Sequence, residues 1–442
     1  MSDDKALQDK LYQYLAEDED ARVCKDIPEQ ACNEQPRAFV LTLLSLTLTK
    51  LGDSLISARL VLPWMLSSLG APAVFISALV PLRESLALLP QLVVAQQLRQ
   101  QPVRKWFWVA GSLGQAVMLL AMAFALAWLS GDSLGWTVVL LLAGFSIARG
   151  VCSVAAKDVT GKTIAKSRRG RLSGVAASIA GLLSVLTALL IMLSPALTAQ
   201  RWLFVLIVLV AACLWMMAAM TYAAIPEVKG ATEGGGNALS EAVKSMRLVI
   251  SNKRFGGFVL IRALLVSTAF AIPYLVVLVQ REGAASITSL GGLMLASGLA
   301  GLLAGRFWGR WSDVASHQVM AAAAGLSVLT MLLALAAYYW ATDWLASAVF
   351  AGLLMFLSAV AHHGARVGRK TYLIDMATQD NRAQLTAVSN TLMGIVLLLG
   401  LLLGWLDSAL GVTAVLWLLI GVGGLATLGA LKLASVSAKT SS

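Results

Sequence analysis

The sequence predicts an all-α membrane protein with twelve transmembrane helices in two pseudo-symmetric six-helix bundles. Of the 442 residues, 58% are hydrophobic and 13% are charged, and the mean hydropathy is +0.79, well above the range of a soluble domain. Apolar segments of about 20 residues, long enough to cross a hydrocarbon layer of about 30 Å as helices, recur from Ala38 to Leu433. These segments are continuous rather than alternating, which disfavours strands.

Twelve such apolar segments are predicted, separated by polar stretches. An even number of crossings places both termini on the same side of the membrane. The predicted spans are 38–63, 72–97, 106–129, 134–156, 172–194, 202–225, 255–280, 286–307, 318–340, 345–368, 384–405 and 411–433.

The distribution of basic residues predicts the orientation. Lys and Arg are retained in short cytoplasmic loops, and here they gather on the side of the termini, whereas the opposite loops carry only Arg201 and Arg281. We therefore expect cytoplasmic termini and a bacterial cytoplasmic (inner) membrane location. The net charge of +11 then comes from basic loop residues that set the topology and contact the lipid bilayer, and no nucleic acid partner is expected.

A polar interruption divides the spans six and six. We expect a cytoplasmic tail over 1–36, helix bundles over 37–225 and 255–433, a cytoplasmic linker with an amphipathic helix over 226–254, and a second tail over 434–442. Cys24 and Cys32 fall on the reducing side, so free thiols are expected.

The two halves also resemble each other weakly. A shift of 214 residues places Gly150 on Gly364 and Arg149 on His363, as expected for a protein built from parallel repeats.

A segment between the eighth and ninth spans, 309–318, reads Gly-Arg-Trp-Ser-Asp-Val-Ala-Ser-His-Gln. It is similar to the Gly-x-x-x-Asp-Arg-x-Gly-Arg-Arg/Lys loop signature of the major facilitator superfamily, with Gly309 and Asp313 matching and the later positions departing. The corresponding loop in the first half carries Arg99 where the signature has its acid, and the fifth span lacks the Gly-Pro signature of the drug/proton antiporters. Together with the twelve spans, the resemblance covers nearly the whole chain.

This resemblance implies a major facilitator fold, alternating access, and a central cavity lined by the first, fourth, seventh and tenth spans. It also implies a gating role for Gly309 and Asp313, in which Asp313 pairs with a basic residue or helix terminus of the other half.

Ionisable residues inside membrane spans are costly, so they mark functional sites. The ionisable residues found inside the predicted spans are Lys50, Asp53, Arg83, Glu84, Arg149, Arg262, His362, His363 and Arg366. All except Arg83 and Glu84, which lie on the second span, fall on the four spans that the resemblance places around the cavity.

The two carboxylates are the candidates for proton coupling. Asp53 lies three residues after Lys50 on one helix face, so the two can form an ion pair in which Lys50 tunes proton binding by Asp53, or a purely structural pair. Arg83 and Glu84 point about 100° apart and each needs a partner on another helix. Glu84 is the second proton site, with a structural pair as the alternative.

The cationic residues predict a substrate-binding site for an anion. Arg149 and His363 are expected to face one another across the cavity with Arg366 one turn from His362, because Arg can grip a carboxylate or phosphate in two places. The alternative for Arg149 and Arg366 is that they extend to the cytoplasmic interface. His362 or His363 could titrate near neutral pH.

No nucleotide-binding motif or paired metal-ligand pattern is present in the sequence, so neither an enzyme, a cofactor nor a metal is expected. The sequence predicts a monomeric secondary active transporter that moves a small solute, favoured to be an organic anion or metabolite, with proton coupling. The alternatives are multidrug or cation efflux, and a non-transporting membrane sensor or scaffold.

Overall fold

The computed structural model describes residue 12 and residues 27–192, 200–230, 246–282, 287–377 and 382–436, which are helical with no strand in these ranges. The first half comprises α2 (Glu29–Asn33), α3 (Gln35–Leu55), α4 (Val61–Ser68), α5 (Ala73–Leu88), α6 (Gln91–Arg99), α7 (Lys105–Trp128), α8 (Gly131–Thr163), α9 (Lys166–Met192) and α10 (Gln200–Ala223). The second half comprises α12 (Arg247–Ser251), α13 (Lys253–Leu264), α14 (Ser267–Glu282), α15 (Ile287–Trp340), α16 (Thr342–Ala346), α17 (Ala348–Met376), α18 (Arg382–Leu398), η1 (Leu399–Leu401), α19 (Leu402–Leu410) and α20 (Val412–Lys432).

Twelve membrane crossings account for these helices. Six crossings are single helices, four in the first half (α7, α8, α9 and α10) and two in the second (α17 and α20). The crossings formed by α3 with α4, α5 with α6, α13 with α14, and α18 with α19 are broken, and α15 supplies two crossings joined at a kink. The predicted all-α, twelve-helix class is confirmed.

Three details differ from the predicted spans. The segment 309–318, expected to be a loop, is helical, and only Ala315 departs from helical geometry, with φ −150° and ψ 70°. The fourth and tenth crossings continue past the predicted 156 and 368, to Thr163 and Met376. Polar residues there extend each helix beyond its apolar part, which hydropathy alone does not reveal.

Two of the expected segments lie largely outside the described residues. The amphipathic linker helix falls mostly within 231–245, and only the five-residue α12 that follows is described. In the tail 1–36, Tyr12 is buried against Phe39, and its hydroxyl accepts a hydrogen bond of 2.6 Å from Gln35. Cys32 is disulfide-bonded, so the expectation of a free thiol there is wrong, because it considered the compartment and not the proximity of a partner.

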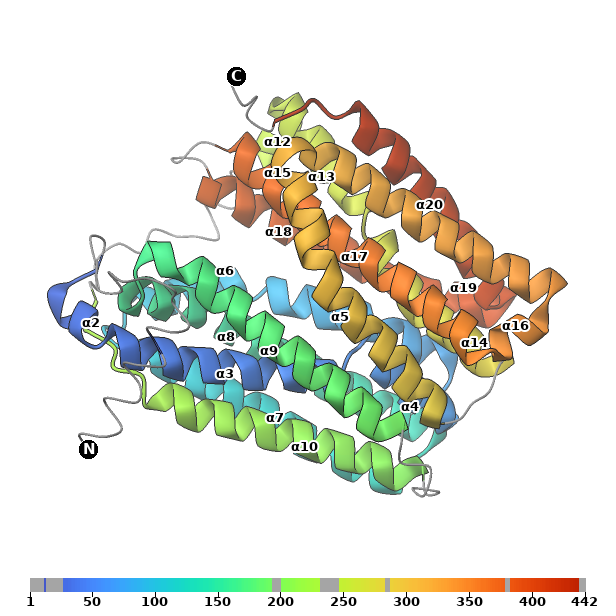
Figure 1. Cartoon of the computed structure of the whole chain (residues 1–442), viewed down its shortest axis with the longest axis horizontal. Coiled ribbons are helices and arrows are strands. Elements are labelled where there is room, and N and C mark those ends of the chain that lie inside the picture. The colour runs from blue at the N-terminus through green and yellow to red at the C-terminus, as the bar shows by residue number, and fades with distance from the viewer. Residues whose placement is uncertain are drawn as a thin grey trace.

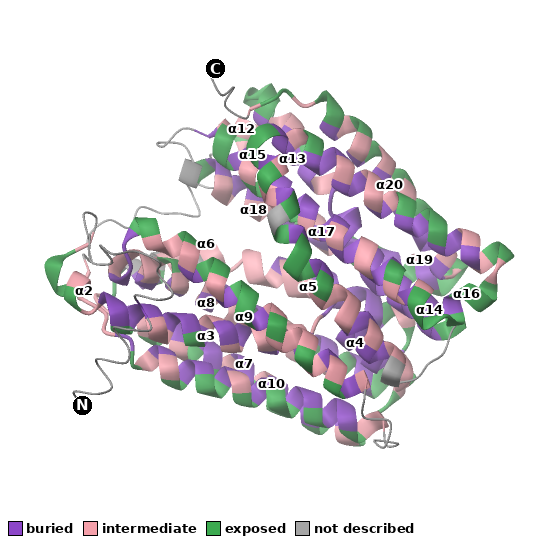
Figure 2. Cartoon of the chain, in the orientation of Figure 1, coloured by how far each residue is buried: buried purple, intermediate pink, exposed green. Residues whose placement is uncertain are grey.

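The outer surface of the protein is apolar. Phe124, Trp128 and Leu140 are each about two-thirds exposed, at 70%, 69% and 67%, and exposed residues recur along the outward faces of the helices (Figure 2). Exposed apolar surface of this extent is stable only against lipid, so the chain is a multi-pass membrane protein. By contrast, 89% of the apolar window of α13 and α14 is buried, which places this crossing in the interior.

The two halves approach each other at one end and diverge at the other (Figure 1). We call the end that holds α2, α12 and the end of α20 the terminal end, and the end that holds α4, α16 and the close of α14 the distal end. Across the halves, α4 packs on α14, α9 on α15, and α5 on α18 and α19. At the distal end, the Gln280 side chain donates to the Trp64 carbonyl (3.2 Å) and the Ser68 hydroxyl (2.6 Å).

Candidate functional site: a cationic cavity between the halves

The first crossing is broken because of Pro63. A proline ring clashes with the carbonyl four residues earlier, which here belongs to Arg59, so α3 ends at Leu55 and α4 begins at Val61. The intervening turn, residues 56–60, holds Arg59 in the interior of the protein. The predicted span 38–63 is continuous and places Arg59 near its end, because hydropathy does not detect a break inside an apolar segment.

The second crossing is broken at Pro90, which directly precedes α6 as its N-cap residue and cannot donate to the carbonyl of Leu86. Gly150 of α8 packs against this region, where an added Cβ would lie 3.1 Å from the Ala87 carbonyl oxygen. The close approach brings α8 and its Arg149 beside α5, which carries Arg83 and Glu84.

These helices and α17 enclose a cavity of about 450 Å³. Six of its lining side chains are cationic and two are carboxylates, a net charge of +4. The charged lining residues are Lys50, Asp53, Arg59, Arg83, Glu84, Arg149, Arg366 and Arg369.

Asp53 is held by two arginines. Arg83 Nη2 donates to Asp53 Oδ1, and Arg149 Nη2 donates to Asp53 Oδ2 at 2.5 Å. The Arg83 guanidinium also lies 4.4 Å from the centre of the Phe145 ring, a cation–π contact. Lys50 and Asp53 share the cavity, but Asp53 forms its ion pairs with the arginines and not with Lys50. Arg149 therefore points inward rather than to the interface.

Glu84 forms its ion pair with Arg59 across the break of the first crossing. Arg83 and Glu84 thus have partners on other elements, as their angular separation predicts. The two carboxylates consequently neutralise three of the six cations in part.

The remaining three cations, Lys50, Arg366 and Arg369, form no hydrogen bond or ion pair with any residue that the structure describes. Arg366 is exposed in the cavity, and Lys50 and Arg369 are partly exposed. Unpaired charge at this depth is costly, so the arrangement is one that an anion would stabilise.

A smaller cavity of about 90 Å³ adjoins the first and shares Arg59, Glu84, Arg366 and Arg369 with it. Arg262 lines this cavity. Its guanidinium donates to Ser389 Oγ at 2.5 Å and to Asn390 Oδ1 at 2.9 Å.

His362 also lines the smaller cavity, with its Nδ1 3.4 Å from the Thr268 hydroxyl. His363 lines neither of these two cavities. It lies toward α15, where a Cβ at Gly301 would be 3.6 Å from its Nε2. Arg149 and His363 therefore do not face one another across this cavity as expected, because the side chain of His363 points away from it toward α15.

The two predicted gating residues lie in α15 just before its kink at Ala315. Asp313 is exposed and has no ion pair within the described ranges, and an added Cβ at Gly309 would meet no atom within 4 Å. In the corresponding region of the first half, Arg104 forms an ion pair with Asp158 at 2.6 Å. The side chain of Arg99 lies outside the described residues.

Two cavity residues were missed from the sequence, Arg59 and Arg369. Arg369 was taken for a loop residue because the tenth span was ended at 368. The spacing of His362, Arg366 and Arg369 by four and three residues is a helical stripe, and it is the signal that would have found Arg369.

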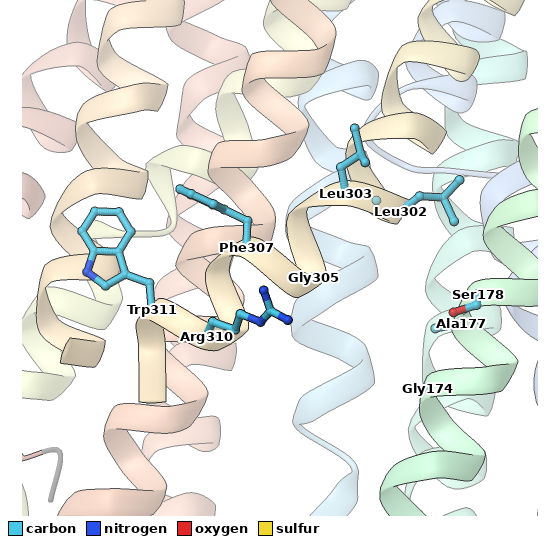
Figure 3. A pocket seen from close by; sticks show the side chains of 10 residues that line it. Gly174, Ala177, Ser178, Leu302, Leu303, Gly305, Phe307, Arg310 and Trp311 are labelled. Atoms are coloured by element: carbon cyan, nitrogen blue, oxygen red, sulfur yellow. The ribbon is translucent and has the colours of Figure 1, made fainter. Parts of the chain in front are cut away.

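A third, largely apolar cavity of about 1060 Å³ lies between α9 and α15, apart from the ion pairs (Figure 3). Small residues of α9 face larger ones of α15 there, and Arg310 supplies its one basic side chain among the lining residues. The residues labelled on the two sides are Gly174, Ala177, Ser178, Leu302, Leu303, Gly305, Phe307, Arg310 and Trp311.

Comparison with known proteins gives a consistent picture of the fold. No family model and no curated protein matches the sequence. Among solved structures, the chain is similar to a POT family transporter in complex with 5-aminolevulinic acid, with a TM-score of 0.67 and 11% identity over 89% of this chain and 95% of that one. It is also similar to the nucleoside transporter NupG (TM-score 0.61, 14% identity, 91% and 98% covered) and to a D-xylose–proton symporter (TM-score 0.64, 15% identity, 91% and 99% covered).

The chain therefore has the overall fold of these solved transporters. At identities of 11% to 15%, the likeness defines the architecture and leaves the substrate to be argued from the cavity.

Proposed function

We propose that this protein is a secondary active transporter that moves a small organic anion by alternating access. The net charge of +4 around a cavity between the two halves is the observation that carries the proposal. Arginine binds carboxylate and phosphate groups through two parallel hydrogen bonds, and a bound anion offsets the cost of cations placed within a membrane.

The conformation supports an inward-facing assignment. Contacts between the halves include Gln280 with Trp64 and Ser68 at the distal end, whereas Asp313 at the terminal end is exposed and unpaired among the described residues. With cytoplasmic termini in a bacterial inner membrane, the terminal end faces the cytoplasm. Gly309 and Asp313 would then close this end in the outward-facing state, as the helix bundles 37–225 and 255–433 rock about the cavity.

Coupling to a proton gradient is assigned to Glu84 and Asp53. Glu84 has one cationic partner, Arg59, whereas Asp53 has two. A proton on either carboxylate would release an arginine into the cavity, which links proton binding to the binding of an anion.

The substrate is assigned to Lys50, Arg366 and Arg369, with Arg83 and Arg149 exchanging between Asp53 and the anion. Arg262 and His362 line the adjoining smaller cavity and support the site from that side. His363 is placed outside both cavities, so we assign it no contact with the substrate.

The alternatives are less compatible with this cavity. Efflux of cations or cationic drugs calls for an acidic site, which six cations around two carboxylates do not provide. A scaffold or sensor that does not transport has no need of ion pairs buried between helices.

The test is uptake into proteoliposomes under an imposed proton gradient, with carboxylates, phosphate esters, sugars and cationic dyes as solutes. We expect gradient-dependent uptake of an anion, reduced at least tenfold by Asp53→Asn. Lys370→Gln, an exposed cation on α17 outside the cavity lining, is the matched control and should transport normally. Uptake of cationic dyes alone, or equal anion uptake by Asp53→Asn, would contradict the proposal.

A further inference from the structure

The pairing of charges in the cavity leaves a defined surplus. Asp53 is shared by Arg83 and Arg149, and Glu84 is paired with Arg59. The cations outside these pairs are Lys50, Arg366 and Arg369.

The surplus comes from both halves of the protein. Lys50 lies on α3 in the first half, and Arg366 and Arg369 lie on α17 in the second, three residues apart and so on one helix face. All three line the same cavity. An anion placed between them would contact both halves at once. No carboxylate of the described cavity lining forms an ion pair with any of these three cations.

We propose that the substrate carries at least two negative charges, as a dicarboxylate or a phosphate monoester does, and that Arg366 and Arg369 bind it opposite Lys50. This inference rests on the proposed transport of an anion and specifies its charge. A monovalent anion would leave the cavity at +3, whereas a divalent one lowers it to +2. Of these two charges, one belongs to the Arg83–Asp53–Arg149 group and one to the three unpaired cations, because the Arg59–Glu84 pair is neutral.

The surplus also bears on the transport cycle. Closing the cavity removes water from its cations, and desolvated charges of one sign destabilise the closed state. The empty protein therefore closes slowly, and the protein loaded with a divalent anion closes readily. Exchange of anions across the membrane should accordingly be faster than net uptake.

Binding is tested by the thermal unfolding of the purified protein in detergent at constant ionic strength. The probes are succinate, inorganic phosphate, and succinamate, which matches succinate in size with one charge fewer. We expect succinate or phosphate to raise the unfolding midpoint and succinamate to have at most a tenth of their affinity. Arg366→Gln and Arg369→Gln should each weaken binding at least tenfold, whereas Lys370→Gln should leave it unchanged.

Arg366→Lys is the second variant, because it keeps the charge if the glutamine variant fails to fold. It should bind the divalent anion more weakly than the wild type and more tightly than Arg366→Gln. Equal binding of succinamate and succinate, or unaltered binding in the α17 variants, would overturn the inference.

Transport distinguishes this inference from the proposed function. In proteoliposomes preloaded with the same anion, we expect entry of labelled succinate or phosphate to be at least fivefold faster than in empty ones. If monovalent anions are transported and divalent ones are not, the charge assignment fails and anion transport stands. If neither kind is transported and neutral solutes are, the proposed function fails as well.

Discussion

Replacing Asp53 by asparagine tests the electrostatic design of the cavity most directly. The substitution keeps the size of the side chain and leaves Arg83 and Arg149 without their shared carboxylate, so the net charge of the cavity rises from +4 to +5. The position lies at the centre of the first-half network, and no other acid contacts either arginine among the described residues.

The expected loss of stability follows from partial burial. Removing one partner of a fully buried ion pair costs about 3–5 kcal/mol. The Asp53 and Arg149 side chains are 23% and 31% exposed, so water screens part of this charge. We expect a loss of about 2–3 kcal/mol, which lowers the unfolding midpoint of a protein of this size by roughly 2–3 °C.

A divalent anion should narrow the difference in unfolding midpoint between the wild type and Asp53→Asn. It binds more tightly to the more positive variant, and a ligand at a concentration of about 100 times its Kd stabilises a protein by about 2.7 kcal/mol. Thermal unfolding of wild type and variant, each with and without succinate or inorganic phosphate, measures the effect. Asp343→Asn, an exposed acid at the distal end, is the matched control and should change neither midpoint. A gap between wild type and Asp53→Asn that stays constant or widens with anion would refute the electrostatic reasoning.

Three further predictions concern the elements around the cavity. Arg59→Gln should slow transport and destabilise the protein by about 1–3 kcal/mol, because Glu84 loses its partner, and adding Glu84→Gln should recover part of the stability in a double-mutant cycle; additive losses would count against the pair. Gly150→Leu should destabilise by about 1–3 kcal/mol through its contact with the carbonyls of α5, whereas Gly161→Leu on the same helix, where an added Cβ meets nothing within 4 Å, should be tolerated in thermal unfolding. Gln280→Leu removes hydrogen bonds between the halves at the distal end, which favours opening there by about 1–2 kcal/mol. We expect greater thiol labelling of cysteines introduced at that end, and unchanged labelling would exclude the opening.

The twelve crossings and the polar cavity could be predicted because both depend on composition. An apolar stretch of sufficient length must cross the bilayer, and a charged residue within it must face away from lipid. For this reason the sequence alone identifies Asp53, Glu84 and Arg149, and each lies in the cavity lining.

The partners of these residues could not be predicted, because they depend on helix rotation and on breaks. Spacing along α3 favoured Lys50 as the partner of Asp53, but the packing of α5 and α8 against α3 supplies two arginines that reach both carboxylate oxygens. Similarly, alignment of the halves paired Arg149 with His363, although adjacent positions on a helix point about 100° apart and it is His362 that lines a cavity.

The breaks in the crossings gave signals that hydropathy averages out. Pro63 and Pro90 each remove a helical hydrogen bond, and the first of them places Arg59 within the protein instead of at its surface. The position of a proline relative to the residue four places earlier is therefore the sequence feature that locates the hidden cation.

The broken first crossing of each half gives the protein two internal joints. The outer pieces, α4 and α14, contact each other, whereas the inner pieces pack within their own halves, α3 against α10 and α13 against α20. The joints themselves line the cavities, with residues 57–59 on the larger and residues 265–266 on the smaller. Under the proposed alternating access, a solute at this depth would touch these joints, and the pieces on the side of the terminal end would move while α4 and α14 stay in contact at the distal end.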